Sequence, residues 1–89
     1  MADYKTYFTD VALKNLKRFP EKDRAIIIEK IKALAENPLA KSNIVKLVEY
    51  DISYRMRAGK YRILFERNDA LKTIDIIDIL PRRKAYRRR

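Results

Sequence analysis

Arginine and tyrosine side chains are the groups in this sequence that could carry chemistry. Arg55, Arg57 and Arg62 lie in a stretch where polar and apolar residues alternate, and Arg82 and Tyr86 lie in a basic C-terminal run. A guanidinium stays charged at neutral pH, and its planar fork matches two phosphate oxygens at once. A phenol can stack on a base or donate its proton. These residue types indicate an anion-binding surface.

Composition excludes catalytic sites that depend on histidine, cysteine or a glycine-rich loop. The chain contains no histidine and no cysteine, which removes imidazole and thiolate metal ligands and the usual general base near neutral pH. A single glycine leaves no material for a phosphate-binding glycine loop. We therefore expect no metal and no cofactor.

The 89-residue chain is strongly basic, with a formal net charge of +10. Most of the excess lies in residues 45–89, and six of the last eight residues are basic. Such a surface attracts phosphate backbones, anionic membranes or acidic proteins, although a terminal basic run can also be merely solvated. The sequence contains no signal peptide and no apolar run long enough to span a bilayer. We expect a soluble cytoplasmic protein with no membrane role.

The alternating stretch predicts a β-hairpin. Residues 50–57 alternate, Ala58, Gly59 and Lys60 form a turn that contains the only glycine, and residues 61–66 alternate again. Because side chains on a strand point to opposite faces in turn, the apolar set should pack on one side. Arg55, Arg57 and Arg62 should then share the other face. The competing interpretation is a solvated face whose arginines pair with nearby acids.

The remaining elements flank this hairpin. Residues 4–8 predict a strand, and residues 11–19 predict a helix that begins after Thr9 and ends at Pro20. A second helix should follow Pro20 and stop at Asn37-Pro38. Its apolar stripe comprises Ile27, Ile28, Ile31, Leu34 and Ala35. A short strand is expected within residues 44–48, and a last strand at residues 72–80. The alternation of the last strand shifts phase at residues 76–77, and such a shift is typical of a β-bulge or of a strand covered on both faces.

This order predicts one domain over residues 1–89 with a basic tail at 82–89. The fold class is α+β, β-α-α-β-β-β(-β), in which an antiparallel helix pair packs on one face of a mostly antiparallel, twisted sheet.

Two segments resemble a known protein family. Residues 54–66, YRMRAGKYRILFE, resemble the central hairpin of the RelE/ParE toxin superfamily, and residues 81–86, PRRKAY, resemble the C-terminal segment of its RelE-like, archaeal-type members. Residues 43–47 and the helices joined by a proline also fit. The hairpin is moderately specific for the superfamily, and the C-terminal segment favours RelE over ParE.

The resemblance implies the toxin of a type II toxin–antitoxin system. RelE-like toxins are metal-independent endoribonucleases that cut mRNA, typically in the ribosomal A site. An acidic cognate antitoxin wraps the toxin, and the pair commonly binds its own operator DNA. The expected partners are therefore the antitoxin, mRNA and the ribosome, with DNA bound only through the toxin–antitoxin complex.

The resemblance also assigns roles by position. Arg62 corresponds to the phosphate-stabilising arginine, Arg82 to the C-terminal catalytic arginine and Tyr86 to the C-terminal tyrosine. Arg55 stands where some members have a catalytic lysine, and a second such lysine is replaced near Ser53, so the general base is not identified. The residues assigned to RNA binding are Arg57, Lys60, Arg83, Lys84 and Arg87.

Three alternatives remain open. A ParE-like inhibitor of DNA gyrase would share the hairpin. A non-catalytic RNA- or ribosome-binding homologue would share the basic face. A basic domain that docks an acidic protein would need neither RNA nor cleavage.

Overall fold

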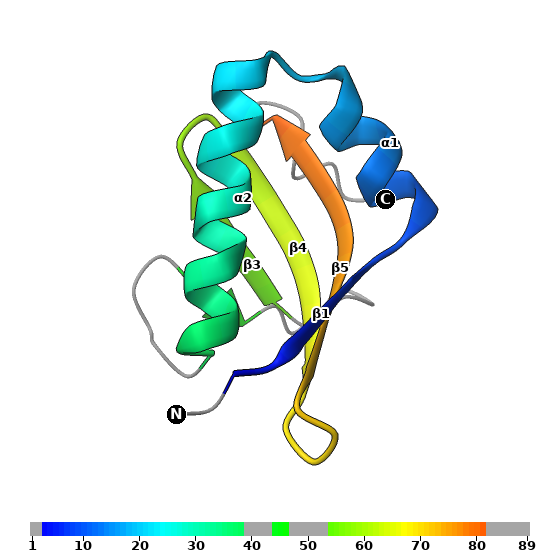
Figure 1. Cartoon of the computed structure of the whole chain (residues 1–89), viewed down its shortest axis with the longest axis vertical. Helices are drawn as coiled ribbons and strands as arrows, with labels where there is room; N and C mark the ends of the chain where they lie inside the picture. Colours follow the sequence, from blue (N-terminus) through cyan, green and yellow to red (C-terminus); the bar gives the residue numbers. More distant parts are fainter. Residues whose placement is uncertain (1–2, 39–43, 47–53, 82–89) are drawn as a thin grey trace.

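The computed structural model describes residues 3–38, 44–46 and 54–81, which form a five-stranded sheet with both helices on one face (Figure 1). The sheet order is β1-β5-β4-β3-β2, with β1 parallel to β5 and every other pairing antiparallel. The elements are β1 (Lys5–Phe8), α1 (Asp10–Arg18), α2 (Glu21–Glu36), β2 (Ile44–Lys46), β3 (Tyr54–Ala58), β4 (Tyr61–Asn68) and β5 (Thr73–Pro81). The predicted α+β class and element order are confirmed. Neither helix in this part of the chain is long and apolar enough to cross a bilayer.

The helix boundaries follow from local chemistry. The Thr9 hydroxyl accepts a hydrogen bond from the Ala12 backbone N–H at 3.1 Å and so caps α1. Pro20 follows α1 and precedes α2, as expected from its tolerance just outside a first helical turn. The two helices run in opposite directions on either side of this joint (Figure 1).

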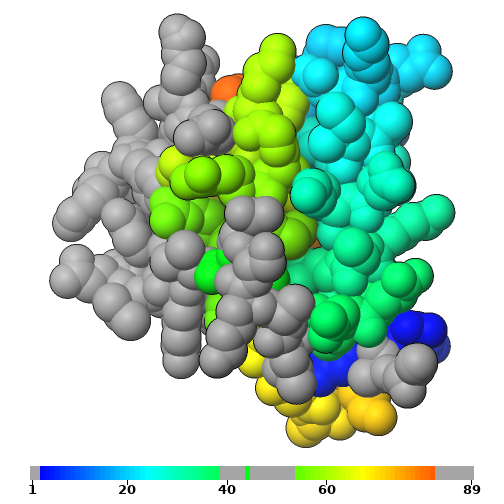
Figure 2. Space-filling view, turned by 90° about the vertical axis from the view of Figure 1, so that its left-hand side faces the viewer, coloured from blue at the N-terminus to red at the C-terminus, as the bar shows by residue number. Residues whose placement is uncertain are grey.

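The β3–β4 hairpin has a two-residue turn made by Gly59 and Lys60. Gly59 adopts a φ of +62°, in the left-handed region that glycine enters without a steric penalty. The turn lies against α2, because a Cβ built at Gly59 would come 3.9 Å from the Ile26 side chain. Figure 2 shows the hairpin residues against the flank of α2.

The phase shift in the last strand is a β-bulge. Leu64 pairs with Asp78 and Phe65 pairs with Ile76, so Ile77 is the additional residue on β5. The Ile77 carbonyl accepts a hydrogen bond of 2.7 Å from the Thr9 hydroxyl. One side chain therefore caps α1 and joins it to the bulge.

The core lies between the helices and the sheet. Ile27, Ile31 and Leu34 of α2 are buried, as are Ile63 and Phe65 of β4. The sequence also places Ile28 in this buried stripe, and that prediction is wrong, since the Ile28 side chain is 42% exposed. An α-helix turns by about 100° per residue, so the residue after Ile27 points towards the edge of the interface rather than into it.

Candidate nucleic-acid interface

The register of the hairpin brings three guanidinium-bearing residues together. Arg57 pairs directly with Arg62, and Arg55 lies two residues before Arg57 on the same strand. Met56 and Ile63, which alternate with these arginines, are buried under the helices. The three arginines therefore lie on the opposite side of the sheet, as the alternation predicts. We call Arg55, Arg57 and Arg62 the arginine face.

The arginine face brings like charges together at directly paired positions, Arg57 and Arg62. Like charges directly opposed across two strands destabilise a sheet by roughly 0.2–1 kcal/mol. Arg57 is exposed, whereas Arg55 and Arg62 are half-buried and each engages at least one other group of the protein. A phosphate bound between the strands would relieve this repulsion.

Acidic residues on the same side of the sheet lie at different distances from the arginine face. Glu66 pairs with Asp75, four residues along β4 from Arg62, which corresponds to about 13 Å at the usual rise of a strand. Asp78, which pairs with Leu64, accepts a 2.7 Å hydrogen bond from the Asn15 side chain of α1. This side of the sheet thus has one acid, Asp78, next to the arginine face and two more, Glu66 and Asp75, near the other end of β4.

The helix layer contacts the hairpin on the side of the sheet opposite the arginine face. The Tyr61 hydroxyl donates a 2.7 Å hydrogen bond to the carboxylate of Asp23 in α2, and its ring centroid lies 4.4 Å from that of Phe19. The hydrogen bond to Asp23, together with burial, raises the pKa of Tyr61 above its ordinary value. Because Tyr61 is the residue before Arg62, this contact positions the backbone that carries the arginine.

Arg67 shows that not every hairpin arginine belongs to the arginine face. Its guanidinium donates to the Pro38 carbonyl at 2.9 Å, forms an ion pair with Asp69 at 2.9 Å and lies 4.8 Å from the centre of the Tyr54 ring. Tyr54 in turn stacks on Phe65, with centroids 5.4 Å apart. Arg67 therefore joins the end of α2 to β3 and β4, a structural role that sequence alternation alone does not reveal.

Several predicted site residues lie outside the described residues, and their placement stays a prediction. They are Arg82, Arg83, Lys84, Tyr86 and Arg87, together with Ser53 and the first half of the alternating stretch. The last described residue, Pro81, pairs with Tyr61, and Leu80 pairs with Arg62. The described chain thus ends beside the arginine face. Lys60 is exposed in the hairpin turn next to it.

The described residues hold no group of three or more acidic side chains that could bind a metal ion. What the arginine face can do chemically is bind phosphate oxygens and stabilise added negative charge on them.

Comparison with known proteins shows that this chain is similar to toxins of type II toxin–antitoxin systems. A family model described as the ParE toxin of type II toxin–antitoxin systems, parDE, matches residues 7–86. A search of curated protein sequences found no match.

Solved structures are similar over nearly the whole chain. The archaeal RelE–RelB complex from Pyrococcus horikoshii matches with 26% identity and a TM-score of 0.79, covering 93% of this chain and 99% of the other. The RelB–RelE antitoxin–toxin complex from Methanococcus jannaschii matches with 30% identity and a TM-score of 0.68, covering 90% and 94%. Isolated Escherichia coli RelE, at 22% identity, shares the fold with a TM-score of 0.74, covering 96% and 87%.

Proposed function

The chain belongs to the ParE toxin family of type II toxin–antitoxin systems and has the RelE-like fold, and from this premise we propose that it is a toxin that cuts mRNA. The reaction is a metal-independent cleavage in which the 2′-hydroxyl of the RNA attacks the adjacent phosphorus and the bond to the 5′-oxygen breaks. The observation that supports the proposal is the pairing of Arg57 with Arg62 on the side of the sheet opposite the helices, with Arg55 beside them.

The reaction has three chemical requirements. The 2′-hydroxyl loses its proton, the pentavalent phosphate is stabilised, and the departing 5′-oxygen gains a proton. Arginine suits the second task because its charge persists and its fork fits two phosphate oxygens. Arginine does not suit proton transfer, since its pKa lies above about 12.

The proposed roles follow from these requirements. Arg62 and Arg82 clamp the scissile phosphate, while Arg55 and Arg57 hold the RNA backbone with help from Lys60, Arg83, Lys84 and Arg87. Tyr86 exchanges the proton or orients the nucleotide, since a phenol titrates closer to neutral pH than a guanidinium does. Arg82 is included because it follows Pro81 in the chain, and Pro81 pairs with Tyr61, the residue before Arg62. The ribosome would align the RNA in its A site, and such alignment is a large part of a reaction barrier.

The proposed biological setting is the cytoplasm, where an acidic antitoxin would neutralise the toxin. The net charge of +10 favours an acidic partner. Operator DNA would be bound only through the toxin–antitoxin complex.

The proposal is tested by mRNA cleavage in a translation reaction with purified ribosomes. We expect Arg62→Ala and Arg82→Ala each to lower the cleavage rate by about 100- to 1,000-fold, as for the loss of one transition-state donor. Tyr86→Phe should also lower the rate. The matched control is Lys22→Gln, which removes an exposed positive charge from the first turn of α2 on the helix side of the sheet. If all three variants cleave as fast as the wild type, the assignment is wrong.

An assay of DNA supercoiling by gyrase distinguishes an mRNA-cutting toxin from the ParE-like alternative. The matching family model, which is described as the ParE toxin, favours that alternative. A wild-type chain that blocks supercoiling and leaves mRNA intact would be a gyrase inhibitor. A chain that does neither but binds ribosomes would be the non-catalytic homologue.

A further inference from the structure

Tyr61 occupies the position where three strands of the sheet meet beside the arginine face. It is the first residue of β4 and directly precedes Arg62. Its backbone pairs on one side with Ala58, which follows Arg57 in β3, and on the other side with Pro81, the end of β5. A displacement of Tyr61 would therefore move the backbone that carries the arginines on both strands of the hairpin.

The Tyr61 side chain is fixed to the helix layer by two contacts. Its hydroxyl donates the 2.7 Å hydrogen bond to the Asp23 carboxylate in the first turn of α2, and its ring lies against Phe19, with centroids 4.4 Å apart. A hydrogen bond with a charged acceptor is stronger than one between neutral groups. Only 9% of Tyr61 is exposed, so little water competes for either contact.

The arginine face has a physical need for such an anchor. Arg57 and Arg62 are directly paired like charges, and their repulsion opposes a close approach of the two side chains. A phosphate in the transition state must nevertheless meet its guanidinium donors in one geometry. Misplacement of a reacting group by about 1 Å can lower a rate by about 100-fold.

We propose that Asp23 and Tyr61 form a positioning pair for RNA cleavage, in which their hydrogen bond fixes the start of β4 and thereby the direction of Arg62 towards the scissile phosphate. This inference rests on the proposed function and adds to it two residues whose side chains meet on the helix side of the sheet. Loss of the bond leaves the charge of the arginine face unchanged. RNA binding therefore persists, while stabilisation of the transition state decreases.

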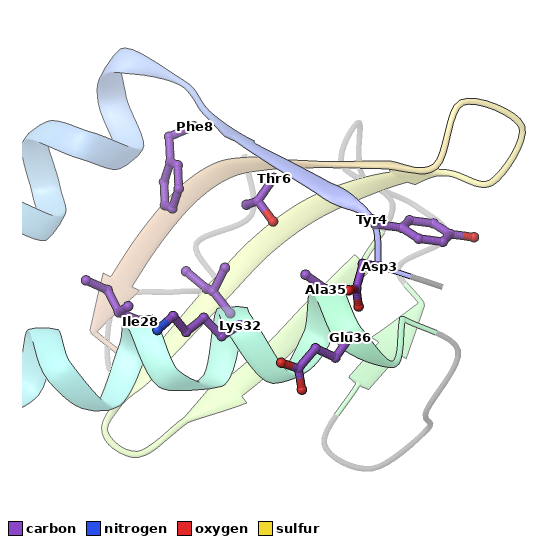
Figure 3. Close-up of a pocket in the computed structure, with 9 residues that line it drawn as sticks. Asp3, Tyr4, Thr6, Phe8, Ile28, Lys32, Ala35 and Glu36 are labelled. Carbon is purple, nitrogen blue, oxygen red and sulfur yellow. The ribbon is translucent and has the colours of Figure 1, made fainter. Parts of the chain in front are cut away.

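The chain offers a matched control at the other end of β4. The Tyr4 hydroxyl donates to the Asp69 carboxylate at 2.9 Å, and Tyr4 is also 9% exposed. Asp69 follows the end of β4, which has eight residues, so the two phenol–carboxylate bonds lie roughly 25 Å apart at the usual rise of a strand. Tyr4 lies in the wall of a groove between β1 and α2 (Figure 3). Tyr4→Phe thus removes the same kind of bond far from the arginine face.

Single-turnover cleavage of mRNA on purified ribosomes, at increasing toxin concentration, measures the maximal rate and the half-saturating concentration separately. We expect Tyr61→Phe and Asp23→Ala each to lower the maximal rate by about 10- to 100-fold and to leave the half-saturating concentration within about twofold. Asp23→Asn retains an acceptor oxygen and should recover most of the rate. Tyr4→Phe should cleave like the wild type, as should Glu21→Ala, which removes an exposed carboxylate from the same turn of α2.

A second measurement does not depend on cleavage. In the protein bound to a 2′-O-methyl RNA, which cannot be cut, the Arg62 side-chain N–H should give one sharp NMR signal in the wild type and in Tyr4→Phe. The signal should broaden in Tyr61→Phe, while fluorescence anisotropy shows nearly unchanged affinity for the RNA. Urea denaturation should show similar losses of stability in Tyr61→Phe and Tyr4→Phe.

A wild-type maximal rate in both Tyr61→Phe and Asp23→Ala would overturn the inference. So would an equal loss of rate in Tyr4→Phe, because the effect would then come from stability alone, or a loss that appears only in the half-saturating concentration. Wild-type protein that binds the RNA but leaves mRNA intact would contradict the nuclease proposal by itself, and the NMR signal would then decide the positioning role. Wild-type protein that does not bind the RNA would overturn both.

Discussion

A hydrogen bond next to the arginine face links the hairpin to the helix layer. Tyr61 precedes Arg62 and donates to Asp23 in α2, and the same ring packs against Phe19. Tyr4 makes a similar bond, at 2.9 Å, to the Asp69 carboxylate in the turn between β4 and β5. In both cases a phenol in or next to the sheet donates to a carboxylate, and both bonds require the phenol to keep its proton.

This requirement predicts a loss of stability at high pH. The hydrogen bond to Asp23 and burial raise the pKa of Tyr61 above its ordinary value near 10. A group whose pKa is raised in the folded state contributes stability below its unfolded pKa and loses that contribution as the pH rises through its folded pKa. The free energy of unfolding should therefore fall above about pH 10.

Urea denaturation at pH 9 and pH 11 measures this effect. Tyr61→Phe has no phenol to ionise, so its stability should change less than that of the wild type between the two pH values. Tyr7→Phe serves as the control, because the Tyr7 side chain is 51% exposed, and it should follow the wild type. Equal pH dependence in all three proteins would contradict the prediction.

At the scale of elements, hydrogen bonds of Thr9 join α1 to β5 at the bulge. The Thr9 hydroxyl caps α1 and also donates to the carbonyl of Ile77, the additional residue of the bulge. The Thr9 backbone N–H donates to the Ile76 carbonyl. One residue therefore stabilises a helix start and determines where the helix meets the sheet.

Thr9→Ala should reduce the free energy of unfolding by about 2 kcal/mol. The lost cap costs about 1 kcal/mol, and the lost hydrogen bond to Ile77 costs about 1 kcal/mol more. Chemical denaturation measures the difference. Thr9→Ser retains the hydroxyl and should lose much less, so an equally large loss in that variant would show that the methyl group, not the hydroxyl, is responsible.

The hairpin turn supports a second prediction at this scale. Gly59 has a φ of +62°, and a β-carbon there meets only the Ile26 side chain at 3.9 Å, so the strain of a substitution is in the backbone. Gly59→Ala should destabilise the protein by roughly 1–2 kcal/mol. Gly59→Asn should lose less, because asparagine tolerates the left-handed region. Thermal or urea unfolding measures both, and equal losses would show that the turn does not impose this conformation.

At the scale of the whole molecule, the position of charge matters more than its total. The radius of gyration is 12.2 Å, larger than the screening length of about 8 Å at physiological ionic strength. A bound phosphate therefore interacts mainly with nearby arginines and weakly with lysines on the helix side.

RNA binding should consequently depend steeply on salt. The three residues of the arginine face alone would contribute a slope of about −2 in log affinity against log salt for a single strand, or roughly a 20-fold loss between 50 and 200 mM, and contacts from the basic tail would make the slope steeper. Fluorescence anisotropy with a 2′-O-methyl RNA, which cannot be cleaved, measures the slope. Arg57→Gln should make it shallower by about 0.7, whereas Lys22→Gln should leave it nearly unchanged. A salt-independent affinity would exclude a phosphate-binding face.

The sequence by itself determined the features that depend on local geometry. Alternation assigned Arg55, Arg57 and Arg62 to one face because side chains on a strand have a period of two. The cap at Thr9, the turn at Gly59 and the interruption at Pro20 follow from the preferences of single residues. The phase shift at residues 76–77 indicated either a bulge, in which an inserted residue reverses the alternation, or a strand covered on both faces.

Only the tertiary structure decided which of these elements meet. The pairing of Arg57 with Arg62, the parallel position of β1 beside β5, the role of Arg67 and the exposure of Ile28 all depend on contacts between segments far apart in the chain. Register and sheet order are selected by the packing of the whole core, and no local preference encodes them. The groove between β1 and α2 exists for that reason, since neither element alone predicts its neighbour.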